Sequence, residues 1–269
     1  MKYVFFGTPE FAAIILEKLI KAGFIPRAVF CNPDKPVGRK QIITPPPVKV
    51  LAQKHGLVVY QPKDKNELLE IIKKLQPDLA IVAAFGMIFP KEILEIPKHG
   101  FINVHPSLLP KYRGATPIQT AILNGDDKTG VSLFLIDEKM DHGAIIANSE
   151  FRMQNAEWNY ENLSKKLAEL GVDLLIETLP KYTNGEIIPL PQDESQATYT
   201  KKFPTQDAYV DLEKDNPIEI DRKIRALNPE PGVWTMKDNK RTKLLEAKII
   251  DGKLKITKIQ VEGGKAQSV

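Results

Sequence analysis

The chain has 269 residues, 42% of them hydrophobic and 27% charged, a composition that predicts a folded core and excludes a disordered chain. Its single cysteine, Cys31, excludes a disulfide framework, and with no signal peptide and no run of about 18 apolar residues we expect a cytoplasmic protein. The net charge of +4 comes from residues 201–269, which hold 15 basic and 11 acidic side chains, whereas residues 1–200 hold 23 of each.

The first 31 residues predict a strand, a helix and a second strand. Lys2–Gly7 is an apolar run that ends in glycine, and Thr8 and Pro9 suit the cap and the first position of a helix. Apolar residues then recur at spacings of three and four until Gly23, and a second strand is expected over residues 27–31, of which 28–31 are apolar. This opening predicts an α/β fold with a doubly wound, mostly parallel, Rossmann-like sheet.

Strands and helices continue to alternate as far as residue 182. Strands are expected from Phe101 and over residues 79–84, 131–136 and 144–151, and helices over residues 47–55, 66–75, 116–124 and 160–182. The run at 79–84 is apolar throughout, as is typical of a strand that is buried on both faces of a parallel sheet.

A second, smaller domain is predicted after a linker. Residues 183–204 are rich in proline and polar residues without a helical period, which is typical of a linker. Residues 205–269 predict a helix at 221–227 and strands at 232–236, 244–250 and 254–261, the last two joined by an Asp251-Gly252 turn. We expect domains at 1–182 and 205–269, the second a β-barrel-like, OB-type domain that is abbreviated because about 65 residues is short for a barrel. Its basic charge indicates either a polyanion partner or only surplus surface lysines.

Several classes of cofactor are excluded because the sequence lacks the motifs that bind them. The first turn between strand and helix, Gly7-Thr-Pro-Glu10, has one glycine, and its carboxylate would repel a pyrophosphate, so we expect no nicotinamide or flavin. There is no P-loop sequence, and one cysteine with four scattered histidines does not form a zinc site, so we expect no metal.

One strand end carries the residues best suited to chemistry. Asn103 and His105 lie two residues apart, so in a strand they point to the same side, where an amide donor and an imidazole can stabilise an oxyanion and move a proton. A third candidate is Asp141, in the loop Lys139-Met-Asp-His-Gly143, whose carboxylate can bond an imidazole. Spacing alone does not separate it from Asp137, Glu138 or His142.

These residues carry a resemblance. The run Asn103-Val-His-Pro-Ser-Leu-Leu-Pro110-x-Tyr-Arg-Gly114, followed by Asp141-x-Gly143, resembles the folate-dependent formyltransferases. Gly7-Thr-Pro-Glu-Phe-Ala, Asn32-Pro-Asp-Lys-Pro-Val-Gly-Arg39 and Pro45-Pro-Pro-Val-Lys49 are similar to the branch of that family that acts on methionyl-tRNA.

The resemblance implies the substrates and the roles of the site residues. The donor is 10-formyltetrahydrofolate and the acceptor is the amino group of methionyl-initiator tRNA, with Asn103, His105 and Asp141 as the catalytic triad. The folate site is expected at Ser107, Leu108, Leu109, Pro110, Phe85, Gly86 and Ile88. We expect the chain to be a monomer.

The tRNA contacts that the resemblance implies lie in two regions. Arg39 and Lys40 belong to the loop 32–45, which the family places against the acceptor end of tRNA and which we expect to be unordered without it. Basic residues of the second domain would bind the tRNA backbone without reading sequence: Lys237, Lys240, Arg241, Lys243 and Lys248.

Two other functions fit part of the pattern. A formyltransferase that acts on an amino-sugar nucleotide would keep Asn103, His105 and Asp141 but would not need Arg39 or the basic end. A non-catalytic RNA-binding protein would need the basic end but not His105.

Overall fold

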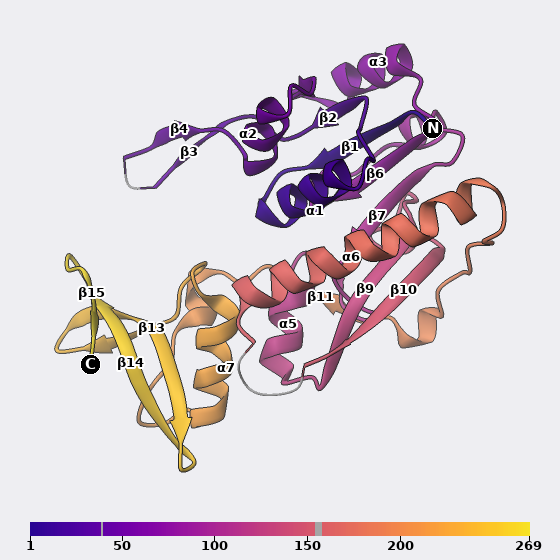
Figure 1. Cartoon of the computed structure of the whole chain (residues 1–269). Helices are drawn as coiled ribbons and strands as arrows, with labels where there is room; N and C mark the ends of the chain where they lie inside the picture. Colours follow the sequence, from indigo (N-terminus) through magenta and orange to yellow (C-terminus); the bar gives the residue numbers. More distant parts are fainter. Residues whose placement is uncertain (39, 154–157) are drawn as a thin grey trace. The chain divides into compact units, whose positions relative to one another are not determined.

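The chain divides into two compact units, which Figure 1 shows in a computed structural model that describes residues 1–38, 40–153 and 158–269. The first unit comprises Met1–Arg113, Gly130–Phe151 and Ser164–Thr198, and the second comprises Gly114–Thr129, Arg152–Leu163 and Tyr199–Val269. The boundaries expected from the sequence, 1–182 and 205–269, stay a prediction. The two divisions differ chiefly in Gly114–Thr129 and Arg152–Leu163, which group here with the C-terminal strands.

A seven-stranded sheet forms the centre of the fold, in the order β10-β9-β7-β6-β1-β2-β5. Its strands are β1 (Tyr3–Gly7), β2 (Ala28–Phe30), β5 (Val59–Tyr60), β6 (Leu79–Ala83), β7 (Phe101–His105), β9 (Lys128–Leu135) and β10 (Ile145–Arg152). The pairs from β7 through β6, β1 and β2 to β5 are parallel, and β9 is antiparallel to β7. The expected doubly wound, mostly parallel sheet is therefore confirmed.

Helices follow the strands at the predicted places, except for a short helix over residues 91–94 that the sequence did not predict. They are α1 (Glu10–Lys21), α2 (Pro47–Lys54), α3 (Lys65–Leu75), α4 (Lys91–Leu94) and α6 (Tyr160–Thr183). The Asp64 carboxylate caps α3 by accepting the N–H groups of Asn66 and Glu67, both at 2.9 Å. No described helix is both long and apolar enough to cross a bilayer.

The predicted cap of the first helix was wrong. Pro9, not Thr8, occupies the cap position of α1 and makes no side-chain cap bond. The Thr8 hydroxyl instead accepts the N–H of Asn32 at 3.2 Å, so it joins the first βα turn to the end of β2. The N-terminus of α1 therefore has no side-chain cap, because the Thr8 hydroxyl bonds the loop after β2 at the carboxyl edge of the sheet.

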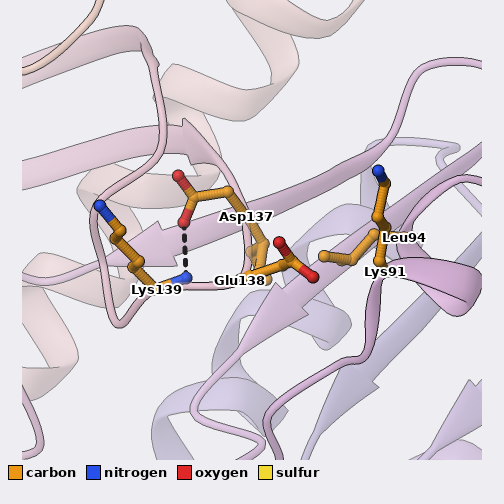
Figure 2. A pocket seen from close by; sticks show the side chains of 6 residues that line it. Lys91, Leu94, Asp137, Glu138 and Lys139 are labelled. Carbon is orange, nitrogen blue, oxygen red and sulfur yellow. Dashed lines mark hydrogen bonds between the residues drawn. The ribbon is translucent and has the colours of Figure 1, made fainter.

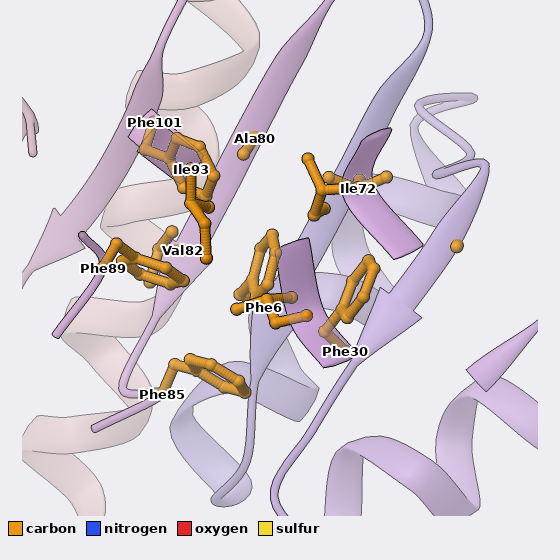
Figure 3. Packing of buried hydrophobic residues seen from close by; sticks show 12 residues of the cluster. Phe6, Phe30, Ile72, Ala80, Val82, Phe85, Phe89, Ile93 and Phe101 are labelled. Atoms are coloured by element: carbon orange, nitrogen blue, oxygen red, sulfur yellow. The ribbon is translucent and has the colours of Figure 1, made fainter. Parts of the chain in front are cut away.

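An aromatic cluster fills the core on one face of the sheet (Figure 3). Phe6 lies at its centre, with ring centroids 4.4 Å from Phe30, 5.2 Å from Phe85 and 5.3 Å from Phe89. Phe101, the first residue of β7, belongs to the same cluster and is 1% exposed. Because strand residues alternate between faces, Asn103 and His105 follow Phe101 on this face.

The opposite face of the sheet packs against α1 and α6. Helix α1 contacts β1 and β6, and its buried residues include Ile15, Leu16 and Leu19. In α6, a β-carbon at Gly171 would lie 2.7 Å from Val104 of β7, so glycine is what allows this helix to approach the strand. The strand that carries Asn103 and His105 is thus held from both sides.

The segment after β2 contains a hairpin that the sequence did not predict, and its lack of order without tRNA stays a prediction. β3 (Lys35–Val37) pairs with β4 (Ile42–Thr44) in antiparallel register. At its base, Lys49 Nζ lies 2.8 Å from the Asp34 carboxylate and 2.8 Å from Gln61 Oε1. Arg39, expected to contact tRNA, lies outside the described residues, whereas Lys40 is described and exposed.

The second unit is a helical pair and an antiparallel sheet. α5 (Pro117–Asn124) packs on α7 (Pro217–Leu227), and α7 packs on β13. The sheet has the order β12 (Trp234–Lys237), β13 (Lys240–Ile250), β14 (Lys253–Val261) and β15 (Ala266–Ser268). The Asp251-Gly252 turn between β13 and β14 is as predicted. Within the described residues the sheet has no pairing of β12 with β15, and the abbreviated OB-type barrel stays a prediction.

The remaining elements are short. They are β8 (Arg113–Gly114), β11 (Tyr199–Thr200) and the 3₁₀ turns η1 (Glu194–Gln196) and η2 (Thr205–Ala208).

Candidate active site

His105 is buried at the end of β7, and one of its two ring nitrogens already makes a hydrogen bond within the protein. Its side chain is 5% exposed, and Nε2 lies 3.0 Å from the backbone carbonyl oxygen of Tyr112. A carbonyl oxygen only accepts, so Nε2 must carry the hydrogen. The lone pair of the neutral imidazole is therefore on Nδ1, which is the nitrogen available to take a proton.

Asn103 lies one pleat before His105 on the same face. Its backbone stands between Val82 of β6 and Phe134 of β9, and its side chain is half-buried. Among the described residues, the structure gives the Asn103 amide no hydrogen-bond partner. A half-buried amide donor beside a histidine can bind an oxygen that gains negative charge.

Asp141 is the carboxylate that the structure brings to His105. Its Oδ2 lies 3.8 Å from His105 Nδ1, and its side chain is 16% exposed. The other candidates point elsewhere: Asp137 Oδ2 lies 2.6 Å from His142 Nδ1, and its other oxygen accepts the N–H of Lys139 at 2.9 Å. A distance of 3.8 Å is too long for a direct hydrogen bond but short enough for the carboxylate to stabilise a positive imidazole.

The loop that carries Asp141 is tightly fitted to β9. Asp141 itself has φ of 49°, in the left-handed region that favours glycine. Gly143 is buried, and a β-carbon there would overlap the carbonyl oxygen of Leu135. The sequence pattern Asp141-x-Gly143 is thus explained: glycine allows the loop to return against the strand.

The Ser107–Pro110 loop is held by hydrogen bonds to Ser132 of β9 and by one of its own. The Ser132 hydroxyl donates to Ser107 O at 2.8 Å and accepts the N–H of Leu109 at 2.9 Å, and the Ser107 hydroxyl donates to Lys111 O at 2.6 Å. Ser107 and Leu109 are buried, whereas Leu108 and Pro110 are half-buried. Of the four residues in this loop that are expected to bind folate, only Leu108 and Pro110 have side-chain surface that a ligand could contact.

The loop at residues 84–90 also contains both buried and exposed members of the expected folate site. Phe85 is 2% exposed in the aromatic core, and its backbone carbonyl accepts from Asn32 Nδ2 at 3.1 Å. Gly86 is exposed, and Ile88 is 71% exposed. The Phe85 ring is therefore committed to the core, and a ligand at this loop would meet its backbone and the Ile88 side chain.

A pocket of about 330 Å³ lies at the start of the Asp141 loop (Figure 2). It is lined by Lys91, Leu94, Ile136, Asp137, Glu138 and Lys139. None of the seven residues expected at the folate site lines this pocket, so the pocket is not the expected folate site.

Sequence reasoning missed a buried arginine and its partners. Arg113 is 0% exposed, and its guanidinium donates to Gln192 Oε1 from Nη2 at 2.8 Å and to Glu194 Oε2 from Nη1 at 3.0 Å. Hydrogen bonding from Arg113 lowers the pKa of the Glu194 carboxyl below its usual value. Arg113 stands in the Tyr-Arg-Gly motif, but its partners lie in the segment 183–204, which the sequence indicated only as a linker.

The basic residues expected to bind tRNA in the second unit fall on two faces of one hairpin. Lys237 pairs with Lys240, and both are exposed, whereas Arg241 and Lys243 are half-buried and project from the other face. The Arg241 guanidinium lies 4.3 Å from the centre of the Trp234 ring, in a cation–π contact. Lys237 and Lys240 are the freer pair for a solvent-side contact, and Lys248 is exposed farther along β13.

The sequence was compared with protein families and curated relatives. Residues 1–179 match the family described as formyl transferase, and residues 202–255 match the formyl transferase C-terminal domain. The methionyl-tRNA formyltransferase of Kosmotoga olearia is 46% identical over 253 residues, covering 93% of this chain and 81% of that protein. The methionyl-tRNA formyltransferase of Caldicellulosiruptor saccharolyticus is 41% identical, covering 100% of this chain and 94% of that protein.

Solved structures of the same fold agree. The methionyl-tRNA formyltransferase from Clostridium thermocellum matches with a TM-score of 0.65 and 18% identity, over 97% of this chain and 98% of that one. HypX from Aquifex aeolicus, in complex with tetrahydrofolic acid, matches with a TM-score of 0.73 and 18% identity, over 100% of this chain and 46% of that one. The two family matches together cover most of the sequence, and the first contains the strand and loops that bear Asn103, His105 and Asp141. The chain therefore belongs to the formyl transferase family.

Proposed function

We propose that this protein transfers the formyl group of 10-formyltetrahydrofolate to the α-amino group of methionine on initiator tRNA. The observation that carries the proposal is the meeting of His105 Nδ1 and Asp141 Oδ2, 3.8 Å apart, beside the Asn103 amide. The names of relatives that are 46% and 41% identical over nearly the whole chain support this choice of acceptor.

The residues present suit a formyl donor. The donor supplies an activated one-carbon group whose carbonyl oxygen gains negative charge when an amine attacks its carbon. Asn103 has an amide with no partner among the described residues, and its N–H groups suit that oxygen. An α-amino group has an ordinary pKa of about 7.7–8.0, so a useful neutral fraction exists near pH 7 without a strong base.

His105 moves the proton in this scheme. As the bond between the amine nitrogen and the formyl carbon forms, Nδ1 takes the proton that the amine loses, because Nε2 is committed to Tyr112 O. Asp141 stabilises the resulting positive imidazole. When the bond from the formyl carbon to the folate nitrogen breaks, His105 returns the proton to that nitrogen. No covalent link to the protein is required.

The folate and tRNA contacts are proposed on exposure and charge. Leu108, Pro110 and Ile88, together with the backbone around Gly86, have surface to meet a flat ring, and Ser107, Leu109 and Phe85 shape the loops that present it. On the tRNA side, Lys40 stands in the β3–β4 hairpin, where Val37, Ile42 and Ile43 are each more than half exposed.

Basic residues of the second unit would hold the tRNA backbone. Residues 234–269 carry 9 basic and 4 acidic side chains, which suits a contact to phosphates that reads charge and not sequence.

A formyl-transfer assay with labelled donor tests the proposal. We expect the purified protein to formylate methionyl-initiator tRNA and not an amino-sugar nucleotide, and His105→Ala to abolish most turnover while tRNA binding is retained. Turnover only on the sugar nucleotide would show that the acceptor is wrong. Binding of tRNA without any formyl transfer by the wild type would favour a non-catalytic RNA-binding protein.

A further inference from the structure

We propose that Gln192 and Thr198 form a clamp that positions both catalytic loops, with Gln192 as the positioning residue for Asp141. The inference concerns the catalytic step of the function proposed above and rests on it for the reaction that is measured. Residues 183–204 have the composition of a linker, yet the side chains of this segment reach the backbone on both sides of the His105–Asp141 pair.

Gln192 fixes the loop that carries Asp141. Its Nε2 donates to Asp141 O at 2.9 Å and to Gly143 O at 2.8 Å. These two carbonyls flank His142, so one amide group holds both ends of the turn. Asp141 adopts a left-handed backbone conformation, φ 49°, which a residue with a side chain keeps only where its surroundings enforce it.

Arg113 sets the orientation of the Gln192 amide. Gln192 Oε1 lies 2.8 Å from Arg113 Nη2 and 3.1 Å from Nε. Because a guanidinium has donors only, the amide oxygen must face Arg113, and the NH₂ group must then face the two carbonyls. The guanidinium is fully buried and also bonds Glu194, so it is a fixed support.

Thr198 supports the other half of the pair. Its hydroxyl accepts the N–H of Tyr112 at 2.9 Å, and its carbonyl oxygen accepts the N–H of Arg113 at 2.8 Å. Tyr112 O is the group that holds His105 Nε2. Gln192 and Thr198 thus act on the two catalytic residues from either end of this short segment: Gln192 on Asp141, and Thr198 on His105 through Tyr112.

The substitution Gln192→Glu tests the clamp at one atom. The carboxylate still accepts from Arg113, but it replaces the NH₂ donor with an oxygen that faces two carbonyls. Gln196→Glu is the matched control: it makes the same change four residues away, where the amide donates only to exposed Asp193 at 2.8 Å. Both variants carry the same added charge.

We expect Gln192→Glu to lower kcat about 10- to 100-fold, with the KM of donor and of methionyl-tRNA within about twofold of wild type. Amide hydrogen exchange at residues 141–143 should become faster, and the pH profile of kcat should shift because the carboxylate near His105 is less well placed. Gln196→Glu should match wild type in all three. Thr198→Val, which removes the acceptor for Tyr112 N–H, should lower kcat in the same way.

Two results would overturn the clamp: equal kcat for the two glutamate variants, or a loss in Gln192→Glu that merely follows a lower fraction of folded protein, as judged by Tm. If the wild type does not formylate methionyl-tRNA, the proposed function fails instead. The clamp is then judged on exchange at residues 141–143, where unchanged protection in Gln192→Glu overturns it.

Discussion

Replacing Asn103 by alanine isolates the oxyanion role of one amide. In the described residues this amide makes no hydrogen bond, so its removal breaks none of the contacts that hold β7, and the half-buried position leaves only a small cavity. We therefore expect a change in folding free energy of less than about 1 kcal/mol, equivalent to a Tm shift of a few degrees. The transition state, in contrast, loses a donor to its charged oxygen, which typically costs about 2.7–4 kcal/mol, or about 10²–10³ in kcat.

The assay is single-turnover formyl transfer to methionyl-initiator tRNA at saturating donor and acceptor. Asn103→Asp should be at least as slow as Asn103→Ala, because a carboxylate both lacks the donor and repels the developing charge. Asn184→Ala removes an exposed amide that donates to Glu186 and should leave kcat unchanged. If Asn103→Ala retains more than about a tenth of wild-type kcat, the amide is not the oxyanion donor and the assignment of the site from β7 fails.

Three further predictions follow from the same structure. Gly143→Ala should lower the free energy of unfolding by about 1–3 kcal/mol and reduce activity, since the new β-carbon would overlap Leu135 O. Urea unfolding measures this change. The control is Gly264→Ala, where the atom nearest to the new β-carbon lies 3.2 Å away. Burial raises the pKa of the Cys31 thiol to about 11, so between pH 9 and 11, where only the unfolded thiol ionises, stability should fall by about 1.4 kcal/mol per pH unit more in the wild type than in Cys31→Ala. Denaturant titrations of the two proteins measure this difference, in which the contribution of the buried Tyr3 hydroxyl cancels. Lys237→Gln and Lys240→Gln should each reduce the slope of log affinity for tRNA against log salt by about one, as measured by fluorescence anisotropy, whereas Lys73→Gln on α3 should not.

The architecture of the sheet could be predicted because its strands are self-evident in sequence. The residues of β1 and β6 are apolar and buried at every position, and the helices between strands have regular apolar spacing. What failed depended on contacts between distant segments. Thr8 had the chemistry of a helix cap, but the N–H of Asn32, 24 residues away, took its hydroxyl. The β3–β4 hairpin was missed because Pro36 and Gly38 have the composition of a loop, and only the pairing partners make Lys35–Val37 a strand.

In the candidate site, too, the residues that a local sequence pattern brings together could be predicted, and those that depend on distant segments could not. Asn103 and His105 could be found from strand alternation alone, since two residues on one strand need no other part of the fold to bring them together. Asp141 could not be chosen over Asp137 by spacing, because which carboxylate faces His105 depends on how the loop returns against Leu135. The folate role of Phe85 stays a prediction, and its ring packs 5.2 Å from that of Phe6 in the core, so its backbone is the part that a ligand could meet.

Gln192 marks the limit of what sequence reasoning can find. A glutamine in a proline-rich stretch has no period, motif or charge that points to catalysis, and its bonds to Asp141 and Gly143 cross 51 and 49 residues. The buried Arg113 explains the position of Gln192, because a guanidinium inside a core requires acceptors, and the Tyr-Arg-Gly motif supplies no carboxylate or amide side chain. Its partners Gln192 and Glu194 lie 79 and 81 residues away in sequence. The same residues then connect the motif to the loop of Asp141, which explains why an arginine that touches no reacting atom stands within the catalytic run.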